Sequence, residues 1–448
     1  MRITLLPLFF LFLFTSAFSQ VQFSGNFTGK GIAFSGEESP FWMHSNQRGR
    51  MNELSNVSAL LGGFASYNIT ENARFTLGVG ALYQDGYIDD LQLDEAFLGF
   101  ENSWLAIHVG RKQRADLYRG LSATNENIVW SLNARPLPGI SLSTTRPIMF
   151  WKDAGLGFQA SLEEFFTDDE RYVMDTRVHH KSFHLVWNKV PNFQFTVGLE
   201  HFAQWAGTSP DHGKLPSGFD DYLKVFTASG LGGESDDFID EQEVNALGNH
   251  LGSYVAGVKT SLQNYNIEVI YNHIFEDGSG QRLGNTPDGR YGIFITDQQP
   301  GKWVDSFMYE FFYTKHQSRT SSGTDGADNY FNNHLYRSGW TYENRILGVP
   351  FIFLDEDRFR VINNIVAAHH VGISGTGVLN MPYRLLASYR KNYGAKGGGQ
   401  LRSDILSTYM DLNVYQSLLN VNLLLGADFT TVASPNFAAG VQVSKTLF

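Results

Sequence analysis

The sequence predicts an all-β fold, a transmembrane antiparallel β-barrel of about 18 strands. Three observations predict it. Apolar and polar residues alternate at period two over runs long enough to cross a bilayer, and brief polar turns alternate with long polar segments between these runs. After residue 20 no run of about 18 apolar residues occurs, so the chain cannot span a membrane as helices and a closed barrel remains.

Residues 1–19 are typical of a secretory signal peptide, with Arg2 ahead of an apolar run and small residues before the cleavage point. An uncleaved membrane anchor is the alternative. We disfavour it because the apolar run, 3–14, is too short for a bilayer core of about 30 Å. We therefore expect cleavage after Ser19. Residues 20–448 should then form a single barrel domain, because no repeat or linker divides them.

The composition suits a barrel in an exported protein. Aromatic residues and glycine are abundant, yet the mean hydropathy is only -0.21 because apolar residues are dispersed. Dispersal is what strands need when one face meets lipid and the other a polar lumen. With 0 cysteines the chain has neither disulfides nor a lipid-anchored N-terminal cysteine. A net charge of -11 without a basic stripe excludes nucleic acid as a partner.

The strands are predicted from the apolar phase of each run. In 419–429 the apolar side chains stand at odd positions, and Asn420, Asn422 and Asp428 stand on the other face. A soluble β-sandwich would alternate in the same way, usually over shorter strands. The same pattern recurs at 75–83, 193–199, 265–271, 307–313 and 408–414.

The connections favour the barrel over the sandwich, since bacterial barrels have short periplasmic turns and longer extracellular loops. Brief turns are predicted at 69–72, 102–103, 188–192, 263–264 and 416–418, and long polar segments at 206–252, 276–304 and 391–404. On this count the last strand, 437–448, runs toward the periplasm. One long segment, 316–357, falls on the short-turn side. Short helical turns are expected around 39–54 and 236–247.

Catalytic motifs are weak. The segment Gly372–Thr376 approaches the G-x-S-x-G elbow of serine hydrolases but has Thr where the last Gly belongs. His184, His201 and His273 fall on the lumen phase, where a membrane-embedded lipase could use one. Polar lining of a barrel explains them more simply. We expect no enzyme, and an outer-membrane hydrolase is the third hypothesis.

Acidic runs occur at 168–170, 236–243 and 355–357. Several hard oxygens could bind calcium, but none of the runs has the spaced ligand order of a calcium loop. Solvated loop charge is the preferred interpretation. We expect neither a metal nor a cofactor.

A basic concentration lies between residues 110 and 146, and tryptophans stand at strand ends beside long loops. The arginines could present bidentate donors to an acidic polymer, or they could pair with lumen carboxylates to hold a plug. The tryptophans could form a membrane girdle or stack on sugars. The candidate glycan-binding residues are Arg111, Arg114, Arg119, Arg135, Trp205, Trp303 and Trp340.

Three blocks of the sequence resemble the Wzi capsule-assembly outer-membrane family. The most specific is N-A-R-P-L-P within Ser131–Leu142, preceded by Gly110-Arg111 at the end of a strand. The other two look like the branch of that family found in Bacteroidetes-type bacteria. They are Pro40-Phe41-Trp42 with Ser45-Asn46-Gln47, and Asn332–Trp340 with Leu347-Gly348-Val349-Pro350.

The resemblance implies an 18-stranded barrel with a small helical plug at its periplasmic end. It also implies a surface lectin that holds capsular or extracellular polysaccharide without catalysis. We expect a monomer in the outer membrane, in contact with its lipid and lipopolysaccharide. The alternative is a porin-like diffusion channel for small solutes, which an open lumen would allow.

Overall fold

The computed structural model describes residues 21–86, 90–229, 247–276, 278–299, 301–319, 328–355, 360–396 and 402–448. The predicted signal peptide lies outside these residues. So does the helical turn expected around 236–247, except for its last residue.

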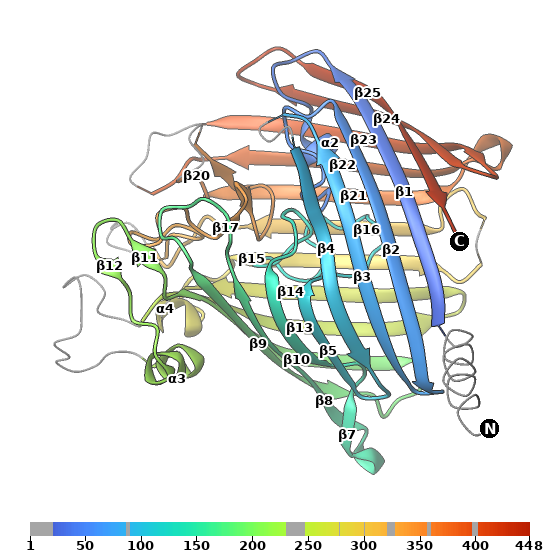
Figure 1. Cartoon of the computed structure of the whole chain (residues 1–448). Coiled ribbons are helices and arrows are strands. Elements are labelled where there is room, and N and C mark those ends of the chain that lie inside the picture. The colour runs from blue at the N-terminus through green and yellow to red at the C-terminus, as the bar shows by residue number, and fades with distance from the viewer. Residues whose placement is uncertain are drawn as a thin grey trace, which may run out of the picture.

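Antiparallel strands close into one barrel with eighteen strand positions, as the sequence predicts (Figure 1). β6 and β7 share one position because both pair with β8, and β25 pairs back with β1 to close the wall. The strands are β1 (Val21–Phe34), β2 (Val57–Thr70), β3 (Ala73–Gln84), β4 (Asp90–Glu101), β5 (Leu105–Arg111), β6 (Pro138–Thr144), β7 (Ile148–Trp151), β8 (Leu156–Phe166), β9 (Arg177–Trp187), β10 (Phe193–Trp205), β13 (Asn249–Leu262), β14 (Tyr265–Phe275), β15 (Gly289–Asp297), β16 (Ser306–Tyr313), β21 (Val366–Thr376), β22 (Pro382–Asn392), β23 (Ser403–Gln416), β24 (Asn420–Thr430) and β25 (Asn436–Thr446).

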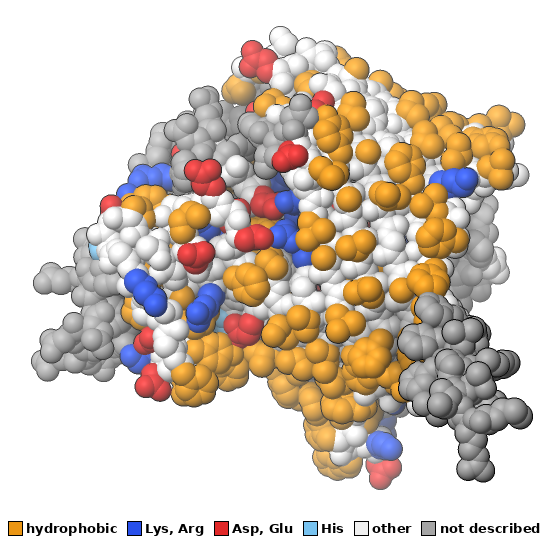
Figure 2. Space-filling view, in the orientation of Figure 1, with side chains coloured by type: hydrophobic (Ala, Val, Ile, Leu, Met, Phe, Trp, Pro, Cys, Tyr) orange, Lys and Arg blue, Asp and Glu red, His pale blue; other side chains and the backbone are white. Residues whose placement is uncertain are grey.

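The predicted apolar phase faces outward. In β24, Leu423, Leu425 and Phe429 are exposed on the outer surface, whereas Leu424 between them is buried inside the barrel. Hydrophobic side chains accordingly cover the wall at β1–β4, and charged side chains gather toward one end (Figure 2). The wall thus has the apolar exterior that contact with lipid requires.

The two ends of the barrel differ in their connections. The short-turn end carries brief links such as 71–72 and 263–264, and the long-loop end carries all the long loops, at the left of Figure 1. One expectation was wrong: 276–304 is not a single loop, because β15 crosses the barrel within it. The strand has only nine residues and polar turns flank it on both sides, so the sequence pattern did not reveal it. Counting it places the segment 316–357 at the long-loop end.

Three long loops fold into the lumen and plug it: 35–56, 112–137 and the described residues of 314–365, called the plug loops below. Their large side chains form an apolar core inside the barrel, which includes Trp42, Trp340, Tyr330 and Phe351. Small hairpins within the long loops are β11 (Thr208–Ser209) with β12 (Gly213–Lys214), β17 (Thr341–Tyr342) with β18 (Arg345–Ile346), and β19 (Phe353–Leu354) with β20 (Val361–Asn363).

The helical plug implied by the family resemblance is replaced by these loops. The described part of the chain has three short α-helices, α2 (Phe41–His44), α3 (Phe219–Thr227) and α4 (Gly278–Gln281), and none forms a bundle at the short-turn end. Two single turns of 3-10 helix, η1 (Lys152–Ala154) and η2 (Val378–Asn380), lie in short connections. Among the described residues, no helix is long and apolar enough to cross a membrane.

Candidate functional site

The three blocks that carry the family resemblance meet inside the lumen. The backbone N–H of Asn46 donates to Oδ1 of Asn133 at 3.0 Å, and Nδ2 of Asn133 donates to the carbonyl of Ile346 at 3.0 Å. The hydroxyl of Ser131 donates to the carbonyl of Gly348 at 2.7 Å. Because buried polar groups are costly when unpaired, these bonds hold the plug loops to one another.

A fully buried ion pair fastens the plug to the wall. Nε of Arg290 on β15 lies 2.7 Å from Glu310 on β16, and both side chains are inaccessible to solvent. Glu310 also accepts hydrogen bonds from Ser122 at 2.9 Å and from the N–H of Ala123 at 2.7 Å, and Arg290 donates to the carbonyl of Glu126 at 3.0 Å. Loop 112–137 is therefore clamped against two wall strands.

Arg111 and Arg135 are buried in a second network of the same kind. Arg111 donates to Asp168 at 2.7 Å and to the hydroxyl of Tyr342 at 2.8 Å. Arg135 forms a bidentate pair with Glu343. Since Tyr342 and Glu343 belong to plug loop 314–365, both arginines use their donors to hold that loop, which is one of the two roles the sequence left open.

Arg114 is paired as well. Its guanidinium lies 2.6 Å from Glu126, contacts Glu163, and sits 4.6 Å from the centre of the Trp130 ring. Burial alone would disfavour its charge, but the two carboxylates raise the pKa of Arg114 above its ordinary value. This arginine is a fixed cation of the plug.

Arg119 lies at the opposite end of the barrel from the other three arginines. Its side chain, 54% exposed, donates to the hydroxyl of Ser306 at 2.7 Å and lies 3.5 Å from Asp305, in the turn between β15 and β16. Loop 112–137 thus enters from the long-loop end and reaches the short-turn end.

The three candidate tryptophans do not share a surface. Trp340 is fully buried in the plug, where its indole N–H donates to the carbonyl of Val129 at 2.7 Å. Trp205 is buried beneath Arg177, whose guanidinium lies 5.0 Å from the ring centre. Trp303 is 66% exposed in the turn before β16, a position that suits an aromatic girdle.

Of the three histidines expected on the lumen phase, only His184 faces the lumen. The expectation was wrong for His201 and His273, because their neighbours Phe202 and Ile274 point into the core and side chains alternate along a strand. Among the described residues, the three histidines contact groups other than a serine hydroxyl. Their partners are Glu200 at 3.5 Å for His184, His250 at 2.8 Å for His201, and the carbonyl of Gly280 at 3.2 Å for His273. Sequence reasoning missed a different pair, His370 and Ser388, at 2.8 Å. Both stand on wall strands, His370 on β21 and Ser388 on β22, and are buried against the plug, where the other ring nitrogen of His370 is bonded to the carbonyl of Leu121. This burial leaves a substrate no access.

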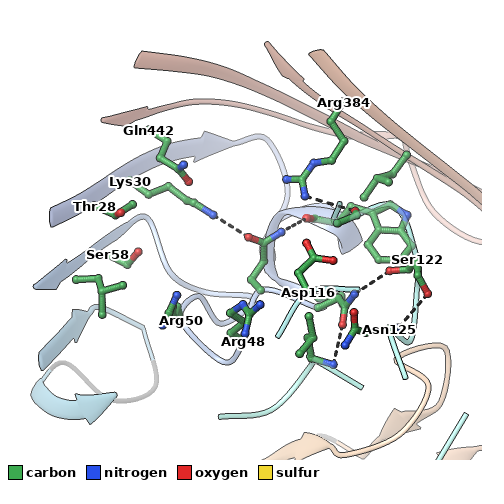
Figure 3. Close-up of a pocket in the computed structure, with 18 of the residues that line it drawn as sticks. Thr28, Lys30, Arg48, Arg50, Ser58, Asp116, Ser122, Asn125, Arg384 and Gln442 are labelled. Carbon is green, nitrogen blue, oxygen red and sulfur yellow. Dashed lines mark hydrogen bonds between the residues drawn. The ribbon is translucent and has the colours of Figure 1, made fainter. Parts of the chain in front are cut away.

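Among the described residues, two cavities in the lumen use loop 112–137 as a wall. The basic cavity, of about 250 Å³, is lined by four cations, Lys30, Arg48, Arg50 and Arg384, and one carboxylate, Asp116 (Figure 3). The balanced cavity, of about 650 Å³, is lined by Lys112, Arg114 and Lys259 together with Glu126, Glu163, Glu200 and Glu268.

Sequence reasoning missed the basic cavity, although a signal for it exists. Lys30 and Arg384 stand on the inward phase of β1 and β22, where their neighbours Gly29 and Leu385 belong to the outward phase. A cation on the lumen phase is costly where a plug buries it, unless it has a partner there. Arg48 and Arg50 follow directly after the Ser45-Asn46-Gln47 block.

The comparisons with known proteins agree with the fold. The sequence model of a family described as capsule assembly protein Wzi matches residues 27–351. Among solved structures, Wzi of Escherichia coli is described as a carbohydrate-binding β-barrel involved in group 1 capsule assembly. It is 13% identical, with a TM-score of 0.62 over 98% of this chain and 87% of that one.

More distant barrels also match. Pseudomonas aeruginosa OccK3 is 11% identical, with a TM-score of 0.49 over 97% of this chain and 99% of that one. OccK5 of the same organism is 10% identical, with a TM-score of 0.47 over 96% and 98%. No curated protein sequence matches this chain.

Proposed function

The chain belongs to the capsule assembly protein Wzi family, and from this premise we propose that it binds capsular or extracellular polysaccharide and anchors it at the cell surface. The observation that carries the proposal is the plug. The residues that resemble the family fill the lumen with hydrogen-bonded loops and an apolar core, so the protein offers a surface to a partner instead of a path through the barrel.

The long-loop end is the binding face in this proposal, because long loops of outer-membrane barrels face the cell exterior. There the guanidinium of Arg337 lies 4.6 Å from the ring centre of Tyr172 and 3.1 Å from Asp211, which also accepts from the Tyr172 hydroxyl. A partly exposed aromatic ring bordered by charged donors and acceptors suits a sugar, which presents an apolar face and a rim of hydroxyls.

The candidate residues from the sequence take two roles in the proposal. Arg111, Arg114, Arg135, Trp205 and Trp340 support the binding face from below, because their side chains are enclosed by the loops. Arg119 and Trp303 lie at the other end, where they border the short turns.

The protein lies in the outer membrane, and the proposal adds three statements about its maturation, its oligomeric state and its contacts. The signal peptide is removed after Ser19. The mature protein is a monomer that binds without catalysing a reaction. Its apolar wall contacts lipid, and lipopolysaccharide surrounds its long-loop end.

A deletion strain tests the proposal. Without the gene, polysaccharide should move from the cell-bound fraction to the medium while the total made per cell stays constant, and a plasmid copy should restore retention. Arg337→Ala on the plasmid should restore it only in part. Unchanged retention in the deletion strain would contradict the proposal.

A further inference from the structure

Four cations and one carboxylate line the basic cavity. Two of its four cations are matched: Arg50 forms a bidentate pair with Asp94 at 2.9 and 2.6 Å, and Arg384 lies 3.2 Å from Asp411. These two pairs are the kind of buried contact that holds loop to wall or strand to strand.

Lys30 and Arg48 are not matched in this way. Nζ of Lys30 donates to the amide oxygen of Gln47 at 2.9 Å, and Arg48 donates to the backbone carbonyl of Arg114 at 2.5 Å. Within the described chain, neither cation has a carboxylate oxygen within 4.0 Å. Burial and the neighbouring Arg50 lower the pKa of Arg48, as expected where positive charge is crowded.

One carboxylate belongs to the lining. Asp116 accepts the backbone N–H of Tyr118 at 3.0 Å and points into the cavity in Figure 3. The carboxylates Asp94, Asp411 and Glu95 stand nearby but outside the lining, so four cations and only Asp116 border the space itself. A buried cation without a carboxylate partner is costly unless an anion occupies the space beside it.

The rest of the lining suits a ligand with hydroxyl groups. Thr28, Ser58 and Gln442 on the wall strands and the indole of Trp42 surround the cations (Figure 3). A volume of about 250 Å³ corresponds to roughly eight water molecules at about 30 Å³ each, enough for one sugar-sized anion.

The cavity is reached from the short-turn end. Asp116, in the part of loop 112–137 that borders it, is solvent-exposed, and Arg119, three residues further on and also exposed, contacts the turn between β15 and β16. This end is opposite to the face assigned to polysaccharide, so the cavity is a separate site.

We propose that the basic cavity is a second binding site, which takes a sugar-sized ligand bearing a carboxylate or a phosphate from the short-turn end. The anionic group lies between Lys30, Arg48 and Arg384, and the hydroxyl groups of the ligand contact the polar side chains of the wall strands. A charge-assisted hydrogen bond from each cation gives the site its preference for anions.

Calorimetric titration of the full-length protein in detergent tests this site with three probes: glucuronate, inorganic phosphate and glucose. Glucuronate or phosphate should bind and glucose should not, and the stronger of the two anions identifies the chemistry. Affinity should fall as salt is raised. Failure of both anions to bind would overturn the site and leave the anchoring proposal untouched.

Four variants locate the binding. Lys30→Gln should weaken anion binding at least about tenfold, since it removes a charge-assisted hydrogen bond to the anion, and Lys30→Arg should keep the binding. Lys445→Gln, which removes the same charge from the exposed surface of β25, should bind like the parent. Asp116→Asn removes the competing carboxylate and should strengthen binding. Equal affinity in Lys30→Gln, Asp116→Asn and the parent would overturn the location.

Discussion

The two lumen cavities share a wall and differ in how their charges are compensated. Each cation of the balanced cavity contacts a carboxylate: Lys112 with Glu101 at 3.6 Å, Arg114 with Glu126 at 2.6 Å and Lys259 with Glu268 at 3.2 Å. In the basic cavity, Lys30 and Arg48 contact neutral oxygens instead. The compensated charges join loop to wall or strand to strand, and the cations without a carboxylate partner border the site proposed for an anion.

The largest effect should come from a compensated pair outside both cavities, the buried pair of Arg290 and Glu310. Glu310→Gln keeps the shape of the side chain but leaves the guanidinium of Arg290 buried without a partner charge. Breaking a buried pair in this way costs about 3–5 kcal/mol, so the free energy of unfolding should fall by that amount. Urea titration in detergent, followed by tryptophan fluorescence, measures it. A loss below about 1 kcal/mol would mean that the pair is not what clamps the plug.

Trp340→Phe should have a smaller effect. The change removes the indole N–H and leaves the carbonyl of Val129 buried and unpaired, at a cost of about 1–3 kcal/mol. Trp303→Phe is the matched control, because Trp303 is exposed and should change stability by less than about 0.5 kcal/mol. Equal losses in the two variants, in the same urea titration, would contradict the assignment of Trp340 to the core of the plug.

Unlike the two variants above, Lys30→Gln should not lower the free energy of unfolding when no ligand is bound. Removing a cation that burial and its cationic neighbours disfavour should leave the free energy of unfolding unchanged or raise it, by at most about 1 kcal/mol. Thermal unfolding at low salt, with and without glucuronate, measures this. Clear destabilisation in the absence of anion would mean that Lys30 is a structural cation like those of the balanced cavity.

Arg337→Ala should have the smallest effect on stability. The residue lies at the protein surface, so the free energy of unfolding should change by less than about 0.5 kcal/mol. Retention of polysaccharide by cells should nevertheless fall, because the variant loses a donor on the proposed binding face. Lys214→Ala, on the neighbouring hairpin, is the control for a lost surface cation. Retention equal to that of the parent would remove Arg337 from the binding face.

The wall could be predicted from the sequence because its signal is local. Period two in 419–429 and in 75–83 depends only on which residues face lipid, and the exposed Leu423 and Leu77 confirm it. β15 was missed because it is short and polar turns flank it. The missing strand is also why 316–357 seemed to lie at the wrong end.

The interior could not be predicted in the same way, because its contacts join distant parts of the chain. The motif Ser131–Leu142 was visible, but its bonds to Asn46 and Gly348 exist only once the plug loops have folded inward. Lys30 and Arg384 belong to one cavity only because β25 closes on β1 and brings β22 near it. A sequence of this kind therefore predicts the barrel and its family before it predicts a site.

The conductance of the purified protein in planar bilayers tests most directly the claim that the plug makes this barrel a binding protein. The apolar core around Trp42 and Trp340, with its compensated ion pairs, predicts no conductance steps at moderate voltage, while a porin reconstituted in the same bilayer conducts. Stable, repeated steps with the parent protein would contradict the account and favour a diffusion channel.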